Sequence, residues 1–151
     1  RKGGQGRDME GSLRISEAAS LAMHAMAYMA TREDADPVSV SSLSRSLGVS
    51  EAHLGKVLQR LARHGYLESR RGPRGGYGLS EGAGELTLLT IYEAVDGPLR
   101  QSSCLLDHRV CTGSSCIFGG LLESVDSQLR DHLSGTRVAD LVLELDQIRE
   151  A

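Results

Sequence analysis

Residues 50–80, SEAHLGKVLQRLARHGYLESRRGPRGGYGLS, carry the pattern from which most of the fold can be predicted. Their first half has apolar residues at the spacing of one helix face: Leu54, Val57, Leu58 and Leu61. Ser50 is a suitable N-cap, and Gly65 stands just past the last residue of the periodic pattern. We therefore expect a helix over residues 51–64.

The second half of this stretch predicts a β-hairpin. Its strands are expected near residues 66–70 and 77–80, around a turn rich in Gly, Pro and Arg. A shorter helix is expected before residue 50, because Val40, Leu43 and Leu47 lie at helical spacing and Gly48 follows. Two helices, a tight turn and a basic hairpin predict a winged helix-turn-helix domain in a mainly α protein with a small β-wing.

Four more helices are expected outside this region. The first begins at the N-cap Ser16 and ends near Thr31, and the second lies within residues 85–99 before Gly97 and Pro98. A long amphipathic helix is predicted for residues 115–133, and a last one for residues 138–148. The long helix has the apolar stripe Ile117, Leu121, Leu122, Val125, Leu129 and Leu133. That stripe is longer than a small winged domain needs, so we expect it to form a homodimer interface.

These elements divide the chain into four parts. Residues 1–12 are polar and glycine-rich, and we expect a disordered leader or an expression remnant. Residues 13–97 are the predicted DNA-binding domain, and residues 98–116 are a cysteine-bearing sensor loop. Residues 117–151 are expected to hold the dimerisation helix and the C-terminal helix.

The charge of the chain is distributed unevenly. The chain has a net charge of −3, yet residues 38–80 hold seven Lys or Arg against two Asp or Glu. Residues 81–151 hold five against twelve. A basic segment within an acidic protein is typical of a surface that binds a polyanion, and double-stranded DNA is the expected partner.

The basic side chains predict where DNA would bind. The helix over residues 51–64 leaves a polar face that carries His53, Lys56, Gln59, Arg60 and Arg63. We expect this helix to enter the major groove, with phosphates or base edges contacted by Ser50, His53, Lys56, Gln59 and Arg60. Arg70, Arg71 and Arg74 crowd the hairpin turn, where mutual repulsion gives no folding benefit, so we expect them to hold the DNA backbone or minor groove.

All three cysteines lie within thirteen residues: Cys104, Cys111 and Cys116. An odd, clustered set in a chain without a secretory leader indicates metal or redox chemistry in a reducing cytoplasm. No stretch approaches the about 18 apolar residues of a membrane span, so we expect a cytoplasmic protein without membrane contact.

Residues 50–80, followed by ELTLLTIYEAVDG and preceded by LRISEAASLAMHAMAYMA, resemble the Rrf2 family of bacterial winged-helix regulators. The resemblance covers about residues 13–145, and the RGPRGGY wing beside EAVDG is its most specific part. It implies a homodimer on a palindromic operator. It also implies that the three cysteines bind an iron–sulfur cluster, either 2Fe–2S or 4Fe–4S, through which a redox, nitric-oxide or iron signal is sensed.

Two differences from the family concern the cluster ligands. The cysteine spacing is C-x6-C-x4-C, where cluster-binding relatives have C-x5-C-x5-C. Gly119 stands where a histidine ligand occurs in some relatives, and Ser20 where others have a carboxylate. The fourth ligand is then expected to be His24 of the partner subunit or His108, or else a small molecule or an open iron site.

Other uses of the cysteines stay open at this point. Zinc in a Cys3His site is chemically sensible, although the tight cysteine pairs of structural zinc sites are absent from the sequence. A thiol switch needs only two cysteines. A regulator of the same fold that responds to a small metabolite or to thiol oxidation, with no cluster, is the alternative function. We do not expect an enzyme, since no nucleophile elbow or phosphate loop accompanies the thiols.

Overall fold

The computed structural model describes residues 15–101, 104–106, 110–111 and 116–141. In chain order its helices are α1 (Glu17–Thr31), α2 (Val40–Leu47), α3 (Glu51–Arg63), α4 (Leu88–Asp96) and α5 (Leu121–Gly135). Strands β1 (Leu67–Arg70) and β2 (Gly76–Leu79) form the sheet, and η1 (Ala83–Glu85) and η2 (Val138–Asp140) are short 3-10 turns. The described chain is thus mainly α with a small wing, as predicted.

Serine and threonine side chains start the helices of the N-terminal half. The hydroxyls of Ser16, Ser39 and Ser50 accept hydrogen bonds from the backbone N–H three residues further on, at the starts of α1, α2 and α3. Thr87 does the same for α4. Gly48 ends α2 in the left-handed conformation, with φ of 67°, which is a conformation that glycine adopts without strain. These caps place α2 and α3 on either side of a three-residue turn, residues 48–50.

The core lies between α1, α3, α4 and the C-terminal end of α5. Ala25 and Met26 of α1, Leu58 and Leu61 of α3, and Ile91 of α4 are completely buried there. Leu133 of α5 and Val138 after it are buried in the same cluster. The end of the predicted dimerisation region therefore packs against the predicted DNA-binding domain.

The wing is an antiparallel pair in which Leu67 lies opposite Leu79 and Arg70 opposite Gly76. A third segment, which the sequence pattern did not predict, joins it. Val38 and Tyr77 exchange two backbone hydrogen bonds of 2.8 Å. The loop that leads into α2 is thereby fixed to the base of the wing.

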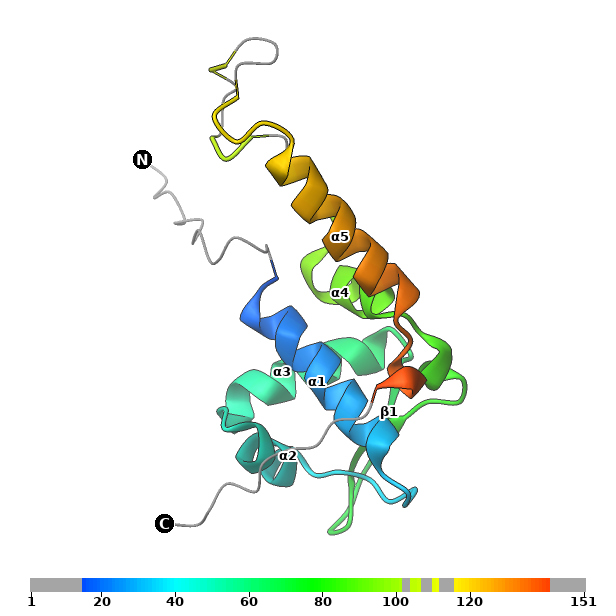
Figure 1. The fold of residues 1–151 in the computed structure, drawn as a ribbon. Helices are drawn as coiled ribbons and strands as arrows, with labels where there is room; N and C mark the ends of the chain where they lie inside the picture. Colours follow the sequence, from blue (N-terminus) through cyan, green and yellow to red (C-terminus); the bar gives the residue numbers. More distant parts are fainter. Residues whose placement is uncertain (1–14, 102–103, 107–109, 112–115, 142–151) are drawn as a thin grey trace, which may run out of the picture.

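Helix α5 starts later than predicted. The apolar repeat suggested a helix from residue 115, whereas residues 116–119 form a turn and the helix begins at Leu121. Gly119 takes a positive φ of 54° and Gly120 is the N-cap, so the two glycines interrupt the periodic pattern. In Figure 1, α5 runs beside α4, and its N-terminal end projects away from the other helices.

In its described part, the predicted C-terminal helix over residues 138–148 is only the short 3-10 turn η2, which ends at Asp140. The Val138 N–H donates to Leu86 O, and the Leu88 N–H to Thr136 O, so this segment is held beside the chain that leads into α4. Arg137 pairs with Asp140, which raises the pKa of Arg137 and holds that of Asp140 below its usual range. Residues 142–148 and the predicted leader, residues 1–12, lie outside the described residues.

Candidate nucleic-acid interface and cysteine segment

Helix α3 has two distinct polar sides. Its buried stripe, Leu54, Val57, Leu58 and Leu61, packs into the core. At 100° per residue, the positions directly opposite this stripe are Lys56, Gln59 and Arg63, and all three are exposed. These side chains form the face that a DNA groove can reach.

One flank of this face holds His53, Arg60 and the C-cap residue His64. Arg60 donates through Nη1 to the backbone oxygen of Val95, at 2.8 Å. Nε2 of His64 lies 3.2 Å from the oxygen of Ala94. Nε2 of His53 is buried and has no hydrogen-bond partner among the described residues. Of the side chains predicted to contact DNA, Arg60 is thus directed at the end of α4, and His53 is partly enclosed.

Ser50 lies at the N-terminus of α3, where its hydroxyl accepts the backbone N–H of His53 at 3.2 Å. The free N–H groups of a helix N-terminus favour an anion. Arg63 was noted on the polar face from the sequence but was not among the predicted contacts. Its position opposite the buried stripe was the available signal.

The wing presents its arginines to solvent. Arg70, Arg71 and Arg74 are exposed, and among the described residues no carboxylate lies within 4.0 Å of any of the three guanidinium groups. By contrast, Arg32 pairs with Asp34, and Arg137 with both Glu85 and Asp140. Cations that the protein leaves without a partner are suited to bind an external anion such as a phosphate.

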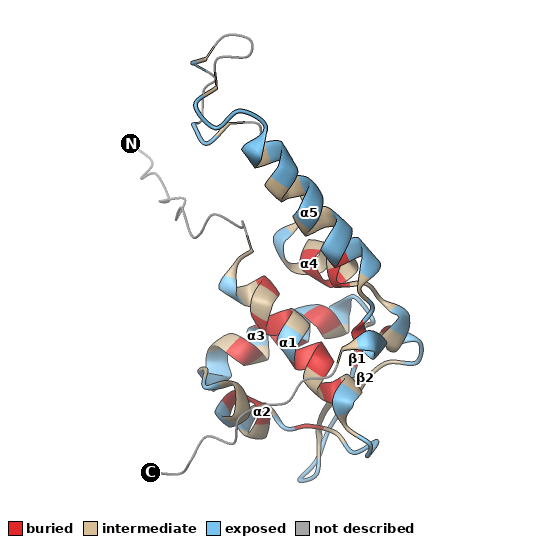
Figure 2. Ribbon diagram, viewed as in Figure 1, coloured by how far each residue is buried: buried red, intermediate tan, exposed pale blue. Residues whose placement is uncertain are grey.

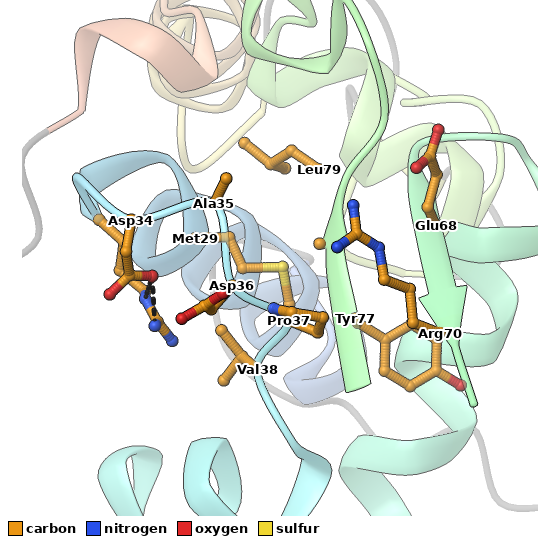
Figure 3. Close-up of a pocket in the computed structure, with 12 residues that line it drawn as sticks. Met29, Asp34, Ala35, Asp36, Pro37, Val38, Glu68, Arg70, Tyr77 and Leu79 are labelled. Carbon is orange, nitrogen blue, oxygen red and sulfur yellow. Dashed lines mark hydrogen bonds and ion pairs between the residues drawn. The ribbon is translucent and has the colours of Figure 1, made fainter. Parts of the chain in front are cut away.

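A small pocket of about 200 Å³ lies between the wing and the loop after α1. Figure 3 shows Asp36 and Pro37 on the loop side and Arg70 and Tyr77 on the wing side. Its lining contains no Ser, Thr, Cys, Lys or His, and its charged side chains are Arg32, Asp34, Asp36, Glu68 and Arg70.

All three cysteines are described, and each is half-buried and outside any disulfide. The described residues include no group of three or more His, Cys, Asp or Glu close enough to hold a metal ion. One chain therefore does not gather the three thiols into a ready-made site. His108 lies outside the described residues.

His24 is exposed on α1. Its Nδ1 lies 2.7 Å from the backbone oxygen of Ser20. Because a carbonyl oxygen can only accept, this hydrogen bond requires a proton on Nδ1, and in that tautomer Nε2 is the nitrogen that can bind a metal. That tautomer is the one that a histidine ligand needs.

Exposed apolar side chains surround the cysteines. Among them, Ile117 is 86% exposed, Val110 69% and Leu121 57%. Figure 2 shows the N-terminal half of α5 largely exposed, whereas its other end packs against buried residues. An apolar stripe exposed at one end of a helix is typical of an interface with another chain.

The helix-turn-helix, the polar face of α3 and the cationic wing define a winged-helix DNA-binding protein. Residues 15–144 match the family model of Rrf2, which is described as an iron-dependent transcriptional regulator. The chain therefore belongs to the Rrf2 family, as its sequence resemblance implied.

Known relatives agree with this assignment. The chain is 28% identical over 130 residues to the HTH-type transcriptional regulator IscR of Citrobacter koseri, covering 86% of this chain and 80% of IscR. It superposes on CymR, the global cysteine regulator of B. subtilis, with a TM-score of 0.68 and 23% identity over 85% of this chain and 95% of CymR. IscR of T. potens superposes with a TM-score of 0.61 and 22% identity over 85% of each chain.

The family and its named relatives are transcriptional regulators, so this chain is a regulator and not an enzyme. The two structural likenesses support the fold. Within the described residues, every helix is too short or too polar to cross a membrane.

Proposed function

We propose that this regulator is a homodimer that binds a palindromic DNA operator and changes its operator affinity in response to a signal at its three cysteines. The cysteines would bind an iron–sulfur cluster, and the signal would be redox, nitric oxide or iron. The protein would act in the cytoplasm.

The DNA-binding part of the proposal rests on the cations that the fold leaves without a carboxylate. Lys56 and Arg63 lie on the face of α3 opposite its buried stripe. The three wing arginines, which follow α3 in the sequence, are also exposed. In this arrangement α3 lies in the major groove, with Lys56 and Gln59 at base edges or phosphates. Ser50 and the N-terminus of α3 approach a phosphate, and the wing arginines hold the flanking backbone or minor groove.

Dimer formation is supported by the exposed apolar side chains at the start of α5. Leu121 is 57% exposed, and Phe118 just before the helix is 39% exposed. In a twofold dimer the same stripe of the partner covers this surface, and two copies of α3 then face two half-sites of a palindrome.

The sensor part rests on the donor chemistry of Cys104, Cys111 and Cys116. Thiolates are the usual ligands of iron–sulfur clusters, and four ligands are normal. The donor type fits a cluster, while the described part of one chain does not bring the donors together. When bound, a cluster supplies reversible electron transfer and reactivity toward small molecules.

The fourth donor is proposed to be His24 of the partner subunit, with His108 as the second candidate. His24 is exposed, and its Nδ1 rather than its Nε2 makes the contact to the backbone oxygen of Ser20. The start of the first helix is joined to the end of α4, because the backbone N–H of its N-cap Ser16 donates to the carboxylate of Asp96 at 3.1 Å.

Anaerobic purification tests this proposal. We expect a coloured protein that contains iron and acid-labile sulfide, and we expect the colour to be lost in Cys104→Ala, Cys111→Ala and Cys116→Ala. Ser127→Ala, an exposed change on α5, is the control that should keep the colour. A colourless protein without iron and sulfide, obtained from cells that assemble clusters, would contradict the cluster. A change of operator affinity on thiol oxidation in that colourless protein would support the alternative, a thiol-responsive regulator.

A further inference from the structure

We propose that Arg60 and His64 of α3 bind the C-terminal end of α4 and thereby couple the cysteine segment to the DNA-contacting face of α3. The inference rests on the proposed sensor function, because it describes how a change near the cysteines reaches α3. In this role Arg60 is a positioning residue and not a DNA contact.

The contacts use groups that a helix end leaves open. The last four backbone oxygens of a helix have no partner within the helix, and cations are favoured beside them. Arg60 donates to the oxygen of Val95 at 2.8 Å, and Nε2 of His64 lies 3.2 Å from that of Ala94. Both oxygens belong to the last turn of α4, which ends at Asp96. Two side chains of α3 thus cap the end of α4.

Other helices bind the same short segment. The Ser16 N–H donates to the carboxylate of Asp96 at 3.1 Å, which joins the segment to the start of α1. Arg130 of α5 donates to the oxygen of Leu99 at 2.6 Å. Residues 94–99 therefore form a junction that α1, α3 and α5 all contact, and Cys104 follows only five positions later.

The geometry of α3 separates this coupling from DNA contact. Arg60 and His64 lie four residues apart on one flank of the helix, whereas Lys56 and Arg63 lie opposite the buried stripe. Because a helix moves as a rigid unit, a displacement of residues 94–99 either breaks the bonds to Arg60 and His64 or turns α3. Turning α3 moves Lys56 and Arg63 relative to the DNA groove.

Arg60 and Arg63 provide a matched pair of variants. Both are exposed arginines of α3, but only Arg60 has a hydrogen bond to α4 among the described residues. The probe is a palindromic duplex that the wild-type protein selects from a random-sequence library. Its dissociation constant is measured over a range of salt concentrations, once with intact protein purified anaerobically and once after alkylation of the thiols with iodoacetamide.

We expect Arg60→Ala to keep the salt slope of the wild type, while the affinity ratio between the two thiol states falls toward one. Arg60→Lys keeps a cation near Val95 and should restore part of that ratio. Arg63→Ala should keep the ratio and reduce the salt slope by about 0.9 for each phosphate that is no longer neutralised, counted in both half-sites of the dimer. If Arg60→Ala instead reduces the slope and keeps the ratio, Arg60 binds a phosphate and the proposal is wrong.

Amide hydrogen exchange separates failure of this inference from failure of the sensor function. If wild-type affinity is the same in both thiol states, the sensor function is wrong. The coupling contact is then judged from exchange at residues 94–101. We expect faster exchange there in Arg60→Ala and wild-type exchange in Arg63→Ala. Equal exchange in all three proteins would overturn the contact.

Discussion

Gly76 stands where β2 begins, and its α-carbon lies against the loop that enters α2. A Cβ at this position would lie 2.3 Å from the backbone oxygen of Val38, a distance that real Cβ atoms do not show. Val38 cannot move away easily, since it exchanges two backbone hydrogen bonds with Tyr77. The position of the wing relative to α2 thus depends on the absence of one methyl group.

We therefore expect Gly76→Ala to lower the free energy of unfolding by about 1–3 kcal/mol, through strain at this contact. Gly78→Ala is the matched control in the same strand, because a Cβ there meets no atom within 4 Å. The control should stay within about 0.5 kcal/mol of the wild type. Urea unfolding measures both, and equal values for the two variants would contradict the close approach.

His24 is the second single residue with a testable role, as the proposed fourth ligand of the cluster. Because it is exposed, His24→Ala should leave the free energy of unfolding almost unchanged. If His24 is the fourth ligand, the same change should shift the visible absorption of the anaerobic protein and speed its loss in air. His132→Ala removes another exposed histidine, on α5, and should change neither. A spectrum and decay rate unaffected by His24→Ala would direct attention to His108.

At the scale of elements, the spacing of apolar residues and the capping residues predicted helices whose ends depend on nearby sequence. The apolar stripe of α3 and its cap Ser50 are both evident in the sequence, so the helix was predicted over residues 51–64, one residue longer than observed. The start of α5 was misjudged because the apolar repeat continues through Ile117, whereas the two glycines after it end the helical geometry. The segment at Val138 was misjudged because its backbone pairs with residues 86–88, a tertiary contact that no local period encodes.

In the candidate site, too, some features could be predicted from the sequence and others depend on how the helices pack. That α3 carries basic side chains is evident from its sequence, and the exposed wing arginines follow from a glycine-rich hairpin. Which of two arginines turns to the end of α4 depends on how α4 packs against α3. The sequence alone therefore cannot show that Arg60, and not Arg63, contacts the end of α4.

The wing as an element supports a prediction about DNA. In the double variant Arg71→Ala/Arg74→Ala we expect weaker operator binding and a salt slope reduced by about 0.9 for each phosphate that is no longer neutralised. Arg137→Ala is the control, since it removes one arginine charge that Glu85 and Asp140 already neutralise. Titrations with labelled operator measure both quantities. An unchanged slope in the double variant would refute the assignment of the wing.

At the scale of the whole molecule, the described fold has two unequal ends. One end holds the wing, with side chains that lack acidic partners, and the other holds exposed apolar residues around the cysteines and the start of α5. Between them, the buried core includes residues from α1, α3, α4 and α5. Residues 94–99 lie where these helices meet, so a change at the apolar end has a route of direct contacts to α3.

The apolar end also leads to a prediction about assembly. Leu121 is 57% exposed on the stripe that continues through Leu122 and Val125, and a charge there could not be covered by an apolar partner surface. We expect Leu121→Glu to sediment as a monomer under conditions in which the wild type is a dimer. Its operator affinity should fall by more than about tenfold, because the two half-sites are no longer bound by linked subunits. Ser127→Glu adds the same charge to the opposite face of α5 and should sediment and bind as the wild type does. Circular dichroism of both variants checks that the helices remain. If Leu121→Glu stays dimeric with its helices intact, the subunits meet through a surface other than the start of α5.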